Sequence, residues 1–568
     1  MFKKLLCEIN NLENAYISRN LINIHKIYKT LSCNMEAVKK LSVKGYISLL
    51  ENGVDIMWVK FIFALIPIAW LIISLAIMKM PAAKASIIGL LIAIFLAITA
   101  FKLPVVDTLT GTLEGILNGL FPIVYIIIAA LFTSKVTFQS GAMQKIQDML
   151  SGLTTDRRIL VLLIAWGFGG FLEAIAGFGT AVAIPASILI TFGIDPIKAS
   201  VICLVANTTP TAFGAVGLPV ITLAQTAGLN QMHTAFIVSL QLVVLIMIIP
   251  YILVGLVGGS PKAIKGVGFI TFMSGLSFAL PQVVIAKFVG PELPAIAGAI
   301  VCIIVTAILA KMHKDDPSED EKAQEIPHHS AGELLQACAP FILVFVFVLA
   351  ASSLFPAVNN ALNAVTVKFP IYTGKNAGLF TFNWLSSPGT LILLATFIGG
   401  LIQGVSVKEL FSILWGVIKG TGKTAVTICS IVALAKVMGY AGMTNALAVA
   451  MVKVMGPVYP LIAPVIGALG TFVTGSDTSA NVLFAKLQYS AASSLGVNKY
   501  WLVANNMVGA TAGKMISPQS ITIASTAIGK EGSESEILKQ AFKWCGIYLV
   551  IICIFLYVTG LLTGNLHF

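Results

Sequence analysis

The chain has 568 residues, of which 57% are hydrophobic and only 11% are charged. An ordinary soluble domain carries roughly 25% charged residues, so this composition excludes that class and indicates a protein that crosses a membrane many times. A formal net charge of +12 would suit a nucleic-acid partner, but the lysines and arginines stand at the ends of apolar segments. Membrane topology explains that placement better. We therefore expect a lipid bilayer, and no nucleic acid, around this chain.

Residues 1–56 differ from the rest, being rich in Asn, Lys and Ile and lacking a long apolar run. They do not read as a signal peptide, because Glu8 interrupts the short apolar stretch after Lys4. We expect this polar extension to be dispensable, or to reflect a reading frame that begins upstream of a natural start at Met57.

Apolar runs suited to crossing the bilayer, which takes ~20 residues, follow this extension. They lie at 59–78, 87–101, 234–256, 341–354, 391–402 and 548–562. With shorter, glycine-broken runs they predict an all-α polytopic membrane protein of roughly 12 to 14 helices, including broken or re-entrant segments. A charged loop at 311–333 separates a first half, 57–310, from a second half, 334–568.

Two polar, glycine-rich segments, one in each half, resemble one another. Placing LVAN at 204–207 on LVAN at 502–505 also brings Gly177 onto Gly475, and Thr180 onto Thr478. Backbone broken by glycine is tolerated at membrane depth only where it is buried in protein or lines a cavity. We predict a two-fold internal repeat, which the sequence alone leaves either inverted or parallel. If it is inverted, as in many carriers and as we expect here, the broken helices meet at one site near the midplane.

Two carboxyl groups stand in these segments, and a charge at the bilayer centre costs roughly 2.5 to 3.5 kcal/mol. Glu173 and Asp477 are therefore the candidates for a group that loads and releases a proton during transport. A purely structural role for either acid stays open, and Asp477 also suits the cap of a half-helix.

Other polar residues near the breaks supply donors and acceptors, and half-helix N-termini add free N–H groups and a positive dipole. Together these suit a small carboxylate. Asn and Thr also join membrane helices to one another, so that interpretation stays open for each. The candidates for substrate binding are Gly177, Gly179, Thr180, Asn207, Thr208, Gly475, Thr478, Ser479, Asn481, Asn505 and Lys514.

Three lysines, Lys436, Lys486 and Lys514, stand in apolar surroundings. Any of them suits a counter-charge for an anionic substrate or a partner for Glu173 or Asp477, and Lys514 is the preferred candidate. The alternative is that their amines reach the membrane interface.

Several soluble-protein motifs are incomplete. GTGKT at 420–424 lacks the first glycine of a phosphate-binding loop, which would fall at Val417, and no strand precedes it. His328 and His329 are adjacent in the charged loop, where solvated histidines are commoner than metal ligands, and the eight cysteines form no CxxC pair. We expect no metal, no cofactor and no disulfide.

The segment DRRILVLLIAWGFGGFLEAIAGFGTAVAIPASIL, from Asp156, resembles the signature region of the lactate permease family of prokaryotic secondary transporters. Similar segments follow in family order: ALAKVMGYAGMTNALA from Ala433, APVIGALGTFVTGSDTSANVLFAKLQ from Ala463, and VGATAGKMISPQSITIAS from Val508. The resemblance covers 57–568 and leaves 1–56 outside.

This resemblance implies uptake of lactate, and often glycolate or another short 2-hydroxy-monocarboxylate, with protons across the bacterial cytoplasmic membrane. Motif positions of the family correspond to Glu173, to 177–185 and 475–481, and to Lys514, without assigning the proton or the substrate to any of them. A sodium-coupled carboxylate carrier is the nearest alternative, because Thr, Asn and Ser beside unwound helices also make sodium sites. A membrane enzyme or a channel is more distant. The pattern leaves open the oligomeric state, a homo-oligomer included, and the preference for D- or L-lactate.

Overall fold

The computed structural model describes residues 55–567 except 79, 176, 178, 314–328, 353, 375, 376, 378, 531 and 532. Within that part, 11 helices are long and apolar enough to cross a membrane, or 12 if the bent pair Pro196–Ala206 and Pro210–Ala227 counts as one span. The predicted all-α polytopic class is confirmed. Most of the polar extension and of the charged loop, including His328, lies outside the described residues. The chain divides into two units, Met1–Ile62 and Phe63–Phe568, and the description below concerns the second.

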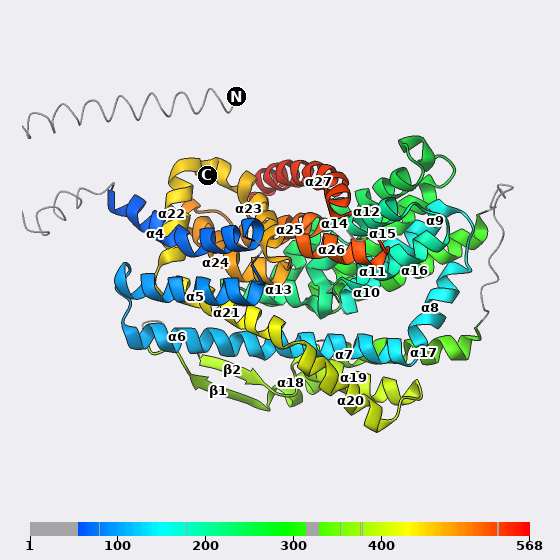
Figure 1. Cartoon of the computed structure of the whole chain (residues 1–568), viewed down its shortest axis with the longest axis horizontal. Coiled ribbons are helices and arrows are strands. Elements are labelled where there is room, and N and C mark those ends of the chain that lie inside the picture. Colours follow the sequence, from blue (N-terminus) through cyan, green and yellow to red (C-terminus); the bar gives the residue numbers. More distant parts are fainter. Residues whose placement is uncertain are drawn as a thin grey trace, which may run out of the picture. The chain divides into compact units, whose positions relative to one another are not determined.

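Helices of the first half include three short π-helical segments and two 3-10 turns, all labelled η. In chain order the elements (Figure 1) are α4 (Asp55–Ile72), η1 (Ile73–Ile77), α5 (Ala82–Thr99), α6 (Val105–Asn118), η2 (Gly119–Val124), α7 (Tyr125–Gln139), α8 (Ala142–Ser151), α9 (Arg157–Val161), η3 (Leu162–Phe168), α10 (Gly169–Ile175), α11 (Thr180–Thr191), α12 (Pro196–Ala206), η4 (Pro210–Phe213), α13 (Gly214–Ala227), α14 (Gln231–Val257), η5 (Pro261–Ile264), α15 (Gly268–Phe288) and α16 (Pro294–Met312).

The second half adds one short β-hairpin to the helices. Its elements are α17 (Ala331–Ala350), α18 (Pro356–Asn363), β1 (Thr366–Pro370), β2 (Leu379–Asn383), α19 (Pro388–Ile402), α20 (Val407–Gly420), α21 (Gly422–Tyr440), α22 (Met443–Met455), η6 (Gly456–Val458), α23 (Tyr459–Thr474), α24 (Asp477–Leu495), α25 (Lys499–Ile516), α26 (Pro518–Ala527) and α27 (Glu534–Leu562). The strands pair antiparallel with Thr366 opposite Asn383. Thr373, after β1, donates to Asp107 of α6 at 2.6 Å, which holds the hairpin beside that helix.

A long span runs along one side of the bundle. The elements α6, η2 and α7 together cover the 35-residue segment Val105–Gln139, longer than the ~20 residues that cross a bilayer. The helix is kinked within η2, because Phe121 has the non-helical angles φ −132° and ψ 123° and Pro122, which follows it, lacks a backbone donor.

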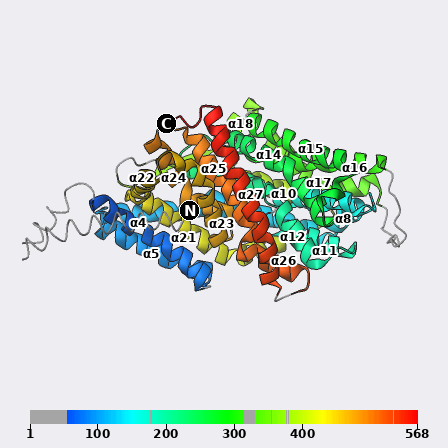
Figure 2. The same ribbon diagram turned by 90° about the horizontal axis from the view of Figure 1, so that it is seen from above.

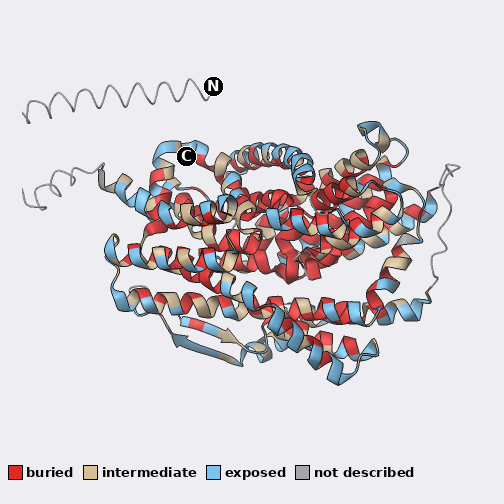
Figure 3. Cartoon of the chain, viewed as in Figure 1, coloured by how far each residue is buried: buried red, intermediate tan, exposed pale blue. Residues whose placement is uncertain are grey.

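The most deeply buried backbone belongs to α10, α12, α13 and α25, where almost every residue is buried (Figure 3). Helix α27 contacts α23 and α25 and crosses over them in the view from above (Figure 2). Small residues allow close packing inside a membrane bundle. A Cβ added to Gly509 of α25 would lie 1.8 Å from the Pro464 carbonyl oxygen of α23, so these helices are in backbone contact.

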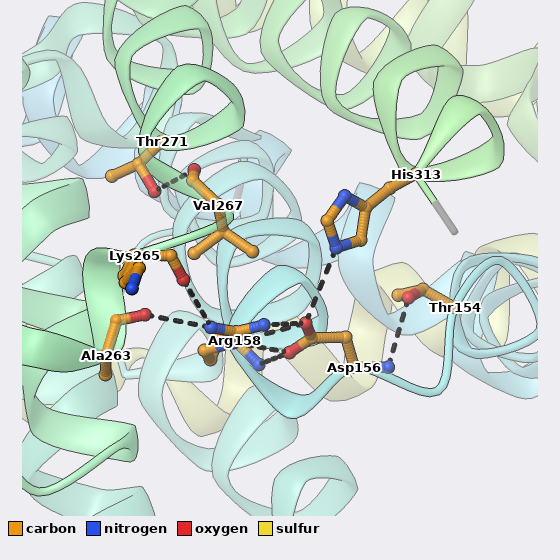
Figure 4. Close-up of polar contacts among 8 residues, drawn as sticks. All are labelled: Thr154, Asp156, Arg158, Ala263, Lys265, Val267, Thr271 and His313. Carbon is orange, nitrogen blue, oxygen red and sulfur yellow. Dashed lines mark hydrogen bonds and ion pairs between the residues drawn. The ribbon is translucent and has the colours of Figure 1, made fainter. Parts of the chain in front are cut away.

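A polar cluster closes one end of the bundle (Figure 4). Arg158 donates to the carbonyl oxygens of Ala263 and Lys265, each at 3.0 Å, and forms an ion pair with Asp156 at 2.6 Å, while His313 lies 4.0 Å from Asp156. Burial raises the pKa of Asp156, but hydrogen bonds from Arg158 and its charge outweigh that effect, so the pKa lies below its ordinary value. The cluster ties α9 to η5 and α16.

Candidate functional site

Both of the glycine-rich segments, one in each half, form breaks between helices. Helix α10 ends at Ile175 and α11 begins after Gly179, which has φ +89°; α23 ends at Thr474 and is followed by Gly475 with φ +73°. Glycine adopts such left-handed conformations without steric cost. The sequence-predicted interruptions in both halves are therefore present, whereas the inverted symmetry relating the halves stays a prediction.

A third break separates α12 from α13 and bends the pair by 55°. Between them lies η4, and α13 then begins with Ala215 and Val216 at φ +44° and +57°. Non-glycine residues in this region are strained, and such strain clusters at functional sites. The break brings η4, which carries Thr211, into the centre of the bundle.

The three breaks bring Glu173, Thr211 and Asp477 together. The Thr211 hydroxyl oxygen lies 3.1 Å from Glu173 Oε1 and 2.7 Å from Asp477 Oδ2. All three side chains are at most 3% exposed. Thus the two carboxyl groups predicted as functional lie on either side of one hydroxyl group, although 304 positions (477 minus 173) separate them in the chain.

This arrangement has a consequence for protons. A threonine hydroxyl carries one hydrogen and can donate it to one acceptor at a time. If Thr211 donates to Asp477, its contact with Glu173 becomes a hydrogen bond only when the Glu173 carboxyl is protonated and donates in turn. When one proton is added to the pair, both contacts can be hydrogen bonds at once: Glu173 donates to Thr211, and Thr211 donates to Asp477.

The remaining carboxyl oxygens, Glu173 Oε2 and Asp477 Oδ1, have no hydrogen-bond partner in the described part of the chain. Lys514 lies close enough for its charge to act on both acids, and its amine donates to the Gly475 carbonyl oxygen at 3.2 Å. With both acids ionised the three groups carry a net charge of −1; with one protonated they are neutral.

Glycine also leaves room for the Glu173 carboxyl. A Cβ on Gly214 would lie 2.9 Å from Glu173 Oε1, and one on Gly177 would lie 3.7 Å from the same atom. The contact at Gly214 is too close for a side chain, whereas that at Gly177 is an ordinary one and glycine there suits its φ of +60°.

Several predicted substrate ligands line the same region. Asn207 faces the Glu173 carboxyl, and its Oδ1 has no partner among the described residues. Thr208 and Thr180 instead donate to backbone carbonyl oxygens of their own turns, at 2.7 and 2.9 Å. Thr478 and Ser479 are buried in the first turn of α24. The cap of that helix is Ser476, so Asp477 does not serve as one.

Asn481 and Asn505 lie farther along their helices and join helices together. Asn481 donates to the Pro219 carbonyl oxygen at 3.0 Å and accepts from Asn506 at 3.0 Å. Asn505 accepts from Gln241 of α14 at 3.0 Å. Their bonds correspond to the interhelical alternative considered for these residues, and a role in substrate binding stays a prediction.

The other two lysines lie elsewhere. Lys436 forms an ion pair with Glu114 at 2.7 Å, and the Lys486 amine lies 4.6 Å from the centre of the Tyr489 ring. Sequence reasoning missed Glu114 and Thr211. Glu114 was detectable as an acid inside an apolar run, whereas threonine is too common in membrane helices to be singled out.

Two cavities are lined in part by elements close to the carboxyl pair, although neither is lined by Glu173 or Asp477. A large cavity of about 1080 Å³ is bounded in part by Ile221 of α13 and Val482 of α24. Val482 follows Asp477 by five residues, or about 7.5 Å of helix. A small cavity of about 640 Å³ reaches Gln519, which lies against Gly475.

The two cavities lie at different levels of the long span. On that span the large cavity contacts residues between 114 and 126, and the small one contacts residues between 127 and 139. The large cavity therefore lies at the middle of Val105–Gln139 and the small one towards its Gln139 end, and neither contacts Glu173 or Asp477.

Metal ligation finds no support in the described residues. They contain no group of three or more His, Cys, Asp or Glu side chains that could hold a metal ion. His329 Nε2 lies 3.1 Å from Asp148 Oδ2, and His328 lies outside the described residues.

Comparison with known proteins gives a consistent result. A family model described as L-lactate permease matches residues 60–563. The L-lactate permease of Streptococcus iniae is 54% identical over 443 residues, covering 78% of this chain and 93% of the relative. The glycolate permease GlcA of Escherichia coli (strain K12) is 33% identical over 525 residues, covering 86% and 93%. The L-lactate permease of Bacillus subtilis (strain 168) is 34% identical over 533 residues, covering 86% and 94%.

Solved structures show a weaker likeness. The efflux pump MtrF of Neisseria gonorrhoeae has a TM-score of 0.44 at 14% identity, covering 79% of this chain and 83% of the other. The YdaH transporter of Alcanivorax borkumensis has a TM-score of 0.46 at 16% identity, covering 80% and 88%.

Proposed function

The chain belongs to the L-lactate permease family, and we propose that it imports lactate, and glycolate or a related short 2-hydroxy-monocarboxylate, together with protons. Its relatives are named permeases, and the 11 helices suited to membrane crossing among the described residues fit a multi-pass carrier rather than an enzyme. We place it in the cytoplasmic membrane.

The observation that supports proton coupling is the single hydroxyl shared by Glu173 and Asp477. A monocarboxylate brings one negative charge into a site where excess charge costs roughly 2.5 to 3.5 kcal/mol. Taking up one proton with each substrate leaves the net charge of the carboxyl pair, Lys514 and substrate unchanged. This balance favours cotransport of one monoanion with one proton.

Substrate would lie beside the carboxyl pair, between the ends of the broken helices. Lys514 supplies positive charge, the first-turn N–H groups of α24 supply donors, and Asn207 Oδ1 supplies an acceptor. A helix N-terminus favours an anion because its N–H groups and dipole point towards it. Neutral donors of this kind also suit the 2-hydroxyl group of lactate.

Access would alternate between the two cavities. In the described structure the large cavity reaches Val482 and the small one reaches Gln519, each a short distance from the pair. Movement of α10–α13 and α24–α26 against the long span would open one path while closing the other. No bond of the substrate is broken, so the cycle needs no nucleophile or cofactor.

The decisive experiment measures uptake of labelled lactate into proteoliposomes under an inward proton gradient, without and with sodium. Accumulation without sodium, and competition by glycolate but not by a dicarboxylate, is the expected result. Accumulation only with sodium would favour the sodium-coupled alternative, in which Thr and Asn side chains serve as ion ligands. Failure to accumulate lactate under either gradient would overturn the substrate assignment.

A further inference from the structure

The wall of the large cavity carries an ion pair that the transport site above does not use. Lys436 of α21 donates to Glu114 Oε1 at 2.7 Å, and Tyr440, one turn later on the same helix, donates to Glu114 Oε2 at 2.7 Å. All three residues line the cavity. One acid of α6 is therefore held by two donors of α21.

The two helices that hold this pair, α6 and α21, are closely packed. A Cβ on Gly115 of α6 would lie 2.3 Å from the Ala433 Cα of α21, so the two helices are in backbone contact. The Tyr440 ring also stacks on Tyr372 at 3.7 Å between centroids, with 5° between ring planes. These contacts fix the position of the lysine relative to the cavity.

Stability alone is a weak reason for such a pair. The desolvation of two buried charges commonly offsets their attraction, and apolar residues of similar volume are often as stable. An ionisable group at membrane depth is instead a functional-site hypothesis by default. The pair therefore suggests a function related to the cavity that it lines.

The positive member of the pair is the more exposed one. The Lys436 side chain is 34% exposed, whereas that of Glu114 is 8% exposed. An ammonium group has three donors, and Lys436 uses one of them on Glu114. Two donors thus remain for an anion in the cavity.

A second amine lines the same cavity from α24. Lys486 has no carboxylate within ion-pair distance among the described residues, and its nearest recorded partner is the Tyr489 ring. The remaining acid on the wall is Glu292, which is half-buried in the connector between α15 and α16. The cavity wall therefore presents two amines, one on α21 and one on α24, beside the Tyr440 hydroxyl that donates to Glu114.

We propose that the large cavity holds a second binding site for a small monocarboxylate, formed by Lys436 and Tyr440 of α21 with Lys486 of α24. The incoming carboxylate accepts from the Lys436 donors that Glu114 leaves free, with the Glu114 charge opposing it, and is then passed along α24 to the carboxyl pair. This inference rests on the proposed function for the identity of its ligand.

The test uses binding of labelled lactate to the purified full chain, measured by equilibrium dialysis. Glu114→Gln removes the charge that competes for Lys436 but retains a polar side chain, so lactate affinity is expected to rise about tenfold. The double variant Glu114→Gln/Lys436→Met, which leaves no unpaired charge, is expected to lose that gain. Lys423→Met, at an exposed position of the same helix, is the matched control and should bind as the wild type does.

A purely structural ion pair would change thermal stability in these variants and leave lactate affinity unaltered. Lactate binding that is equal in wild type and in both Glu114 variants would overturn the second site while leaving the proposed function intact. Absence of lactate binding to the wild type would instead overturn the proposed function and, with it, the ligand of this site. A Lys514→Met variant should still bind some lactate through the second site. Lys436→Met should abolish that part of the lactate binding.

Discussion

Thr211→Val is the sharpest test of the shared hydroxyl, because valine retains the volume and branching of threonine while removing only the hydroxyl group, which is both a donor and an acceptor. The hydroxyl contacts Glu173 at 3.1 Å and Asp477 at 2.7 Å and makes no other recorded hydrogen bond. A hydrogen bond to a charged group contributes about 1.5 to 3 kcal/mol. Since 1.4 kcal/mol corresponds to a tenfold change, uptake should fall by roughly 10- to 150-fold.

The assay is the initial rate of labelled lactate uptake into proteoliposomes under an inward proton gradient, with the amount of reconstituted protein measured for each variant. Thr211→Ser keeps the hydroxyl group and is the control, with a rate close to that of wild type. Counterflow of lactate, measured with equal pH on both sides of the membrane, requires lactate binding but no proton gradient. It therefore separates loss of proton coupling from loss of binding. Gradient-driven uptake by Thr211→Val within about twofold of wild type would refute the reasoning, because this is far less than the loss of one such hydrogen bond implies.

Three further predictions follow from the contacts. Asp477→Asn should insert normally, as judged by membrane yield, but lose gradient-driven lactate accumulation; wild-type accumulation would remove its proton role. Gly475→Ala should lower the melting temperature and slow uptake, since its φ is +73° and the added Cβ would lie 2.4 Å from Gln519 Oε1. Asp156→Asn should lower the melting temperature at pH 7. Because Arg158 depresses the folded-state pKa of Asp156 below its ordinary value of 3.8, the difference from wild type should persist above that value and vanish as pH falls through the folded-state pKa. A difference that persists in stronger acid would contradict this.

Much of the architecture was predictable because the membrane imposes strong constraints on sequence. Apolar composition predicts the helical polytopic class, and glycine interrupting an apolar run predicts a break, as at Gly177 and Gly475. The β1–β2 hairpin was not anticipated. Its FTFN strand has an alternating pattern too short to stand out beside long apolar runs.

The acids of the site were predictable for an energetic reason. A carboxyl group in an apolar segment is energetically costly, so Glu173 and Asp477 stand out in the sequence as candidates. Their proximity, by contrast, depends on three helix breaks. One of these breaks places Ala215 and Val216 at positive φ, and neither residue type signals that conformation.

The same reasoning explains why the pairing of charged groups could not be read from the chain. Lys436 is 322 residues from Glu114, and its sequence neighbourhood resembles that of Lys514, whose charge acts on the carboxyl pair instead. Sequence identifies which side chains are too costly to bury alone, but only the packing of α6 against α21 determines which of them share a partner. The glycine that permits this packing, Gly115, is adjacent to the acid that the packing buries. Neighbouring residues therefore specify both the close contact of α6 with α21 and the position of the charge. A bulky substitution at Gly115 would displace Glu114 from Lys436 without altering either charge.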